Sequence, residues 1–117
     1  MLTKQEILDR AVDGLRNQNW EPAYSGGNCQ YLTTSGHRCA WGHVDTSLTV
    51  ESCAASYTPL FDTICDDTEF ADSLQAAHDS AADPQVRAAA RYNFKYGEME
   101  NNFRKFAAYH GLVFKEA

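Results

Sequence analysis

Apolar side chains recur at helical spacing near both ends of this chain, and this periodicity is the feature that most restricts its fold. Near the N-terminus, Thr3 and Glu6 have the spacing of a capping box. The pattern predicts a helix that begins there and ends near residues 17–19. The apolar stripe on its buried face is Ile7, Ala11, Val12 and Leu15.

A longer periodic segment follows Asp83 and Pro84, which have the residue types of an N-cap and a first helical position. We expect one helix from there to about His110, stopped by Gly111, with Gly97 as a place where it can break or kink. Its stripe repeats at steps of four and three residues and comprises Tyr92, Tyr96, Met99, Phe103, Phe106 and His110. Core or dimer packing is the interpretation that we favour over a cofactor site.

Between these segments, Asp66 or Asp67 is expected to cap another helix, with Glu69 completing a second capping box after Asp66. The predicted buried stripe of this helix is Phe70, Leu74, Ala77 and Ala81. His78 and Asp79 on it are interpreted as two surface residues, because neighbours in sequence point apart on a helix.

The segment 28–45 is the ambiguous part of the chain. Residues 29–33 read as a short strand and residues 34–36 as a turn, whereas residues 38–44 suit either a return strand or a short helix. The sequence therefore predicts an α+β fold: a mostly helical single domain over residues 1–117 with a β-hairpin-like element around residues 29–44.

Charge is distributed unevenly along the 117 residues, whose net charge is −6. No lysine or arginine occurs between Cys39 and Val86, an interval that holds nine acidic residues. Such a segment repels nucleic acid and attracts basic protein surfaces, although it is also typical of a solvated face that aids solubility. The candidate partner-binding residues are Asp62, Asp66, Asp67, Glu69, Asp72 and Asp79.

Two cysteines and two histidines in the ambiguous segment are the candidates for metal or thiol chemistry: Cys29, His37, Cys39 and His43. They suit zinc chemically, but six extended residues put the two histidines about 20 Å apart, which is too far for one ion. If residues 38–44 are helical, Cys39 and His43 become neighbours that can share zinc with Cys29. A Cys39 thiolate beside a histidine is the other alternative, as the nucleophile of a small enzyme.

Several classes of protein are disfavoured by what the sequence lacks. No apolar run approaches the about 18 residues of a membrane span, and the polar N-terminus does not resemble a secretory signal. We therefore expect a cytoplasmic protein with free thiols. No phosphate-binding loop or hydrolase motif occurs, and the scattered basic residues argue against direct binding of nucleic acid.

A further pattern around the two cysteines consists of Cys29, Tyr31, Gly36, Cys39, Ala40, Gly42, Val44 and Asp45. With looser likeness in residues 74–79 and 103–112, this pattern resembles a group of small proteins common in phages and prophages. His43 stands where that group usually has a cysteine or a small residue. The resemblance implies a phage setting inside a host cell and no particular activity.

These observations favour a small acidic protein that binds a host protein stoichiometrically and is not an enzyme. The concrete form is an anti-CRISPR-like inhibitor of a bacterial defence or nucleic-acid-processing complex, whose acidic segment 45–83 blocks a basic groove. The prediction includes no cofactor, with zinc as the open alternative, and either a monomer or a homodimer. The rival hypotheses are a metal- or thiol-dependent enzyme centred on residues 29–43 and a homodimeric structural protein.

Overall fold

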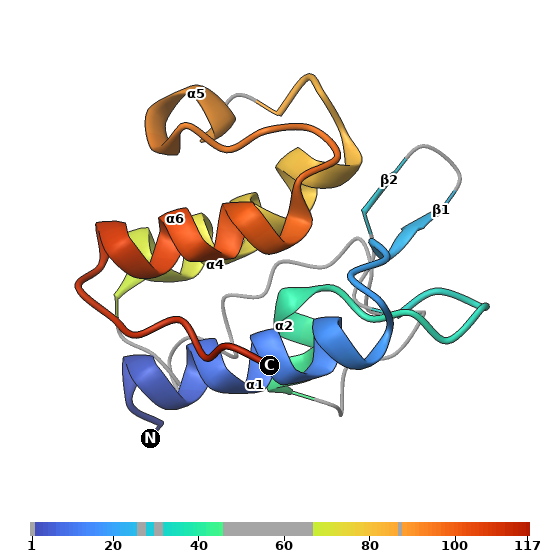
Figure 1. Cartoon of the computed structure of the whole chain (residues 1–117). Coiled ribbons are helices and arrows are strands. Elements are labelled where there is room, and N and C mark those ends of the chain that lie inside the picture. Colours follow the sequence, from blue (N-terminus) through green and yellow to red (C-terminus); the bar gives the residue numbers. More distant parts are fainter. Residues whose placement is uncertain (1, 26–27, 30–31, 46–66, 87) are drawn as a thin grey trace.

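The computed structural model describes residues 2–25, 28–29, 32–45, 67–86 and 88–117. Helices α4 (Thr68–Ala82) and α6 (Met99–Tyr109) run side by side in opposite directions, as Figure 1 shows. Helix α1 (Lys4–Asn17) packs against the short helix α2 (Ala40–Val44), and α2 also contacts α4. The main core lies between these helices, where Trp41, Phe70 and Phe103 are fully buried.

Helix α1 begins and ends as its sequence predicts. Thr3 and Glu6 form both hydrogen bonds of the capping box, and the four apolar residues of the stripe are buried together with Leu8. At the other end, Asn19 has a positive φ of 56° and its N–H bonds to the Arg16 carbonyl, while the Trp20 N–H reaches the Leu15 carbonyl. This pattern of hydrogen bonds is a Schellman motif, with Asn19 in the left-handed position.

The prediction for α4 is confirmed for its cap and its buried stripe. The Asp67 carboxylate accepts a hydrogen bond from the Phe70 N–H at 3.0 Å, so Asp67 is the N-cap. Because the N-cap is Asp67, position N3 is Phe70, and the second capping box that we predicted with Glu69 does not form. All four residues of the predicted stripe are buried.

The prediction of one helix from residue 84 to about residue 110 is wrong, although Gly97, which the sequence marks as a place where it can break, lies in the loop that interrupts it. The segment forms α5 (Ala88–Tyr92) and α6, separated by a loop in which Asn93 and Gly97 have positive φ angles of 60° and 75°. The buried side chain of Asn102 holds this loop, because its amide bonds both the N–H and the C=O of Lys95, at 2.8 and 2.9 Å. Gly111 ends α6 as predicted.

The aromatic stripe is divided by this break. Met99, Phe103 and Phe106 are buried in the core of the single chain, whereas Tyr96 lies in the loop and is 63% exposed. The buried part of the stripe therefore packs within the monomer.

The fold class predicted from the sequence is also wrong. Of the described residues, 56% are helical and 4% are in strands, so the domain is not α+β. Strands β1 (Tyr24–Ser25) and β2 (Asn28–Cys29) form a two-residue antiparallel ladder, and Leu32 and Arg38 form an isolated bridge. Residues 40–44 form helix α2 and not a return strand, so the expected hairpin around residues 29–44 is reduced to these few pairs.

The C-terminal residues return along α1 (Figure 1). The side-chain amide of Gln5 bonds both the N–H and the C=O of Val113, at 3.0 and 2.8 Å. Phe114 stacks on Trp20 with a centroid distance of 6.3 Å, and Arg16 donates to the Lys115 carbonyl. The end of the chain is thereby tied to the first helix.

Candidate functional site

Cys39 is the N-cap of α2 and is fully buried. Its sulfur accepts a weak hydrogen bond from the Gly42 N–H at 3.4 Å. Burial raises the pKa of this thiol to about 12, so it stays protonated at neutral pH. A protonated thiol without solvent access is unsuited to the nucleophilic role that was one alternative from the sequence.

The two histidines of the cluster do not meet Cys39 at a shared site. His43 packs its ring against Gly14 of α1, and its Nε2 lies 2.9 Å from the Gln18 amide oxygen. The pKa of His43 is lowered to about 4, chiefly by burial and secondarily by Arg38. His37 is half-buried in the preceding turn. The Cys29 side chain lies outside the described residues, and among the described ones no group of three or more ligand side chains is placed to hold a metal ion.

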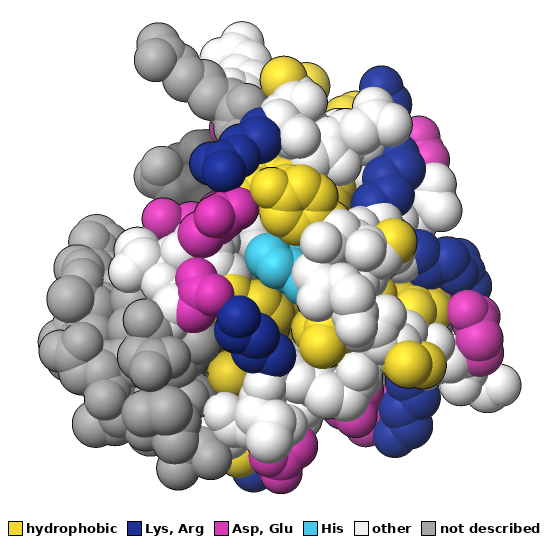
Figure 2. All heavy atoms as spheres, turned by 90° about the vertical axis from the view of Figure 1, so that its left-hand side faces the viewer, with side chains coloured by type: hydrophobic (Ala, Val, Ile, Leu, Met, Phe, Trp, Pro, Cys, Tyr) yellow, Lys and Arg dark blue, Asp and Glu magenta, His cyan; other side chains and the backbone are white. Residues whose placement is uncertain are grey.

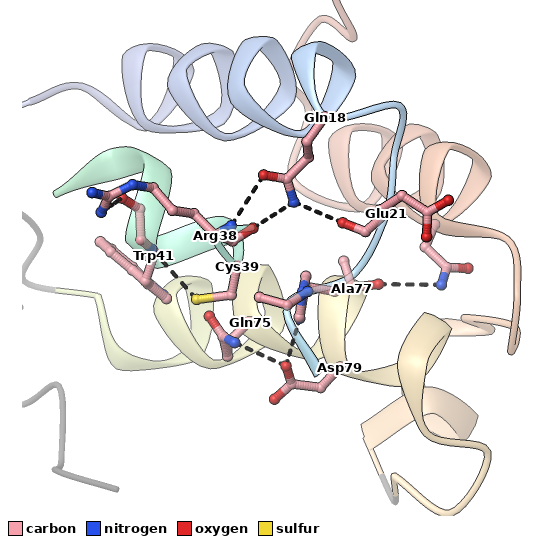
Figure 3. A network of polar contacts seen from close by, with 12 residues as sticks. Gln18, Glu21, Arg38, Cys39, Trp41, Gln75, Ala77 and Asp79 are labelled. Atoms are coloured by element: carbon pink, nitrogen blue, oxygen red, sulfur yellow. Dashed lines mark hydrogen bonds and ion pairs between the residues drawn. The ribbon is translucent and has the colours of Figure 1, made fainter. Parts of the chain in front are cut away.

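Gln18 is the centre of a polar network that joins the end of α1 to α2 (Figure 3). Its amide nitrogen donates to the carbonyls of Glu21 and Arg38 at 2.7 and 2.8 Å, and its oxygen accepts from the Arg38 N–H at 3.0 Å. The same oxygen faces His43. These bonds occupy the hydrogen-bonding groups of Gln18, so the network fixes the packing of the two helices.

His78 is fully buried, so the interpretation of His78 and Asp79 as two surface residues is wrong for His78. Its Nε2 accepts a hydrogen bond from the Ala23 N–H at 2.9 Å and therefore carries no proton. Its Nδ1–H donates to the Asp79 carboxylate at 2.8 Å, and the Gln75 amide donates to the same oxygen at 2.8 Å. Both ring nitrogens therefore have hydrogen-bond partners within the protein, and His78 links α4 to residue 23.

Gln75 connects this link to Cys39. Its side chain lies beside the Cys39 thiol (Figure 3) and lowers the pKa of that thiol, an effect that burial outweighs.

The candidate partner-binding acids lie in different surroundings. Asp62 and Asp66 fall outside the described residues. Asp67, which is 38% exposed, forms an ion pair with Lys4 at 2.7 Å, and Glu69, which is 48% exposed, forms one with Arg91 at 3.1 Å. Asp72 is exposed one turn further along α4.

Asp79 differs from the other described acids, because its side chain is only 26% exposed and is held by His78 and Gln75. The structure thus groups Asp67, Glu69 and Asp72 at the beginning of α4 and separates Asp79 from them. Figure 2 shows acidic side chains beside basic ones on this end of the molecule.

A serine–histidine contact is present that sequence reasoning missed. Ser73 Oγ lies 2.7 Å from His110 Nε2, but the serine is fully buried and its hydroxyl donates to the Phe70 carbonyl at 3.0 Å. The hydroxyl oxygen therefore accepts from His110, so the histidine is not positioned to remove the serine proton. Burial, followed by the charge of Lys4, lowers the pKa of His110. The two residues are 37 positions apart, and no local pattern connects them.

Comparison of the chain with protein-family models, with curated proteins and with solved structures found no match. None of the described helices combines the length and apolar character needed to cross a membrane. The function is therefore inferred from the residues of this chain alone. In the described part of the chain, the buried candidates for chemistry have structural partners, whereas the acids at the start of α4 face solvent.

Proposed function

We propose that this protein acts by stoichiometric binding to a host protein in the cytoplasm, through its acidic segment. The concrete form is an anti-CRISPR-like inhibitor that blocks a basic groove of a bacterial defence or nucleic-acid-processing complex. The main support for the proposal is the negative charge of the interval from Cys39 to Val86, which has nine acidic residues and no lysine or arginine. A surface of this composition attracts a basic partner and repels the nucleic acid that such a partner holds.

The exposed carboxylates at the first turns of α4 support this mechanism. Asp67 and Glu69 are paired with Lys4 and Arg91, whose side chains are also largely exposed. Exposed ion pairs contribute little stability, about 0–1 kcal/mol, so both carboxylates can exchange their partners for basic groups of another protein at small cost. Asp79 is left out of the proposed surface, because it is engaged by His78.

The first experiment is capture of partners from a bacterial lysate by the tagged protein. We expect a partner that is retained at low salt and released at about 0.5 M salt, where attraction between exposed charges is screened. The captured complex should lose its own binding of DNA or RNA when the acidic protein is added in equimolar amount. Retention that does not depend on salt, or undiminished nucleic-acid binding, would contradict the mechanism.

A charge-neutral variant then tests the surface. The double change Glu69→Gln and Asp72→Asn should slow association with the captured partner and flatten its salt dependence, because the steering charge is reduced. The matched control, Asp9→Asn with Asp13→Asn, removes the same number of charges from α1. If both variants lose association rate equally, net charge and not the α4 surface is responsible.

A further inference from the structure

A surface pocket of about 560 Å³ lies where the turn after α1 meets the end of α4 and the beginning of α6. It is lined by residues 19–22, 97–101, Ala81 and Arg104. Ala81 lies fourteen residues beyond Asp67 along α4, which is about 21 Å at 1.5 Å per residue. The pocket is therefore separate from the acidic first turns of α4.

Backbone hydrogen bonds hold the walls of this pocket. The Schellman motif at Asn19 and Trp20 sets the path of the chain into Glu21 and Pro22. On the opposite side, the Gly97 N–H donates to the Ala81 carbonyl at 2.9 Å and ties the start of α6 to the end of α4. Because both walls are fixed in this way, a ligand finds the pocket already formed.

The pocket has an excess of negative charge. Three of the residues that line it are acidic, Glu21, Glu98 and Glu100, and one is basic, Arg104. Arg104 bonds Glu100 at 3.1 Å and Glu116 at 2.8 Å, so its charge is compensated within the protein.

The negative charges of Glu21 and Glu98 are not balanced by an ion pair with a described residue. Glu98 accepts a hydrogen bond from the uncharged amide of Asn101, and its side chain does not cap α6. The carboxylate of Glu21 points away from the Gln18 network (Figure 3). No lysine or arginine of the described residues forms an ion pair with either carboxylate.

We propose that this pocket binds an arginine side chain of a partner protein. A planar guanidinium presents several N–H donors in a fixed geometry that suits carboxylates, and Glu21 and Glu98 supply the uncompensated pair. Trp20, Pro22 and Met99 offer apolar contact for the aliphatic part of the side chain. The helix dipole places a partial charge of about +0.5 at the N-terminus of α6, which repels a cation. The negative charge of the two carboxylates is larger than this partial charge.

The inference rests on the proposed function for the class of partner, but its test needs no partner. A capped five-residue peptide with one central arginine is titrated into the labelled protein and followed by NMR. We expect saturable shifts of the amides that line the pocket, weaker shifts with a lysine peptide, and none with a citrulline peptide, which has the same shape without the charge. Equal responses to all three peptides, or no saturable shift with arginine, would overturn the proposal.

Variants locate the binding. The double change Glu21→Gln and Glu98→Gln should weaken binding of the arginine peptide by about fivefold or more. The matched control is Asp9→Asn with Asp13→Asn on α1, which changes the net charge equally outside the pocket and outside the acidic turns of α4, and should leave the affinity unchanged. Equal losses in both variants would mean unspecific attraction to an acidic protein and would refute the site. Because the peptide assay is independent of the lysate partner, its failure leaves the proposed function standing.

Discussion

Replacing Gly14 with alanine tests how closely α1 and α2 pack. A Cβ atom at Gly14 would lie 2.2 Å from both Cγ and Nδ1 of His43 and 2.7 Å from its Cβ. Carbon atoms in contact prefer about 3.5–4.0 Å. The close approach of the His43 Cβ means that rotating the ring is not sufficient, so α2 itself must shift.

The expected change in the free energy of unfolding is the difference between a gain in helix stability and a loss of packing. Alanine in place of glycine inside a helix stabilises it by about 1 kcal/mol. Overpacking costs about 1–3 kcal/mol, and displacing His43 from Gln18 costs about 0.5–1.5 kcal/mol more. We therefore expect Gly14→Ala to lower the free energy of unfolding by about 1–3 kcal/mol in urea denaturation followed by circular dichroism.

A double-mutant cycle makes the test independent of the absolute value. In a His43→Gly background both the ring and its Cβ are gone, so Gly14→Ala should stabilise the protein by up to about 1 kcal/mol. The predicted signature is a change of sign between the two backgrounds. If Gly14→Ala has the same effect in both, His43 does not fill the space in front of Gly14 and the reasoning is refuted.

Three further predictions concern groups with named partners. The pKa of His43 is about 4, below its ordinary 6.5, so the unfolded chain binds more protons between these values and stability should fall as the pH falls through that window. The loss should be about 1–2 kcal/mol after allowance for partial exposure, and urea denaturation should show a shallower pH dependence for His43→Gln. Asp67→Ala removes the N-cap of α4 and should cost about 1 kcal/mol, whereas Lys4→Met, which keeps the cap, should cost less by the same measurement. Mass spectrometry after alkylation should find Cys39 unmodified in the native protein and modified in urea, and rapid native modification would contradict its burial.

Local signals in the sequence were sufficient for the ends of several helices. The Thr3–Glu6 capping box, the Asp67 cap and the Gly111 stop each depend on residues within one or two turns. Gly97 marked a place where the last helix can break, but local patterns could not show that the helix does break there. The break depends on Asn102, which bonds Lys95 in the loop and also donates to the Ala77 carbonyl of α4 at 3.2 Å. Periodicity alone continues through the break, because the residues on both sides keep helical spacing.

The sequence predicts which residue types make up the candidate acidic surface, but not how those residues are arranged or paired. The charge pattern indicates an acidic surface, yet it does not reveal that Lys4 pairs with Asp67 or that Asp79 is held by a buried histidine. His78 can be buried at low cost because its acceptor nitrogen bonds the Ala23 N–H, 55 residues away in the chain. Contacts over such separations follow from the packing of helices and have no local pattern.

Among the described residues, the buried histidine and serine have hydrogen-bond partners within the protein, which supports the proposal that the protein binds a partner. A catalytic group needs a hydrogen-bonding site that substrate can occupy, but both ring nitrogens of His78 and the hydroxyl proton of Ser73 are already committed to the protein. A binding surface needs only accessible charge of one sign, and Glu21 and Glu98 supply it beside a preformed pocket. The two proposed surfaces at opposite ends of α4 call for the same kind of partner, so a basic protein surface about 21 Å long is the ligand that would engage both.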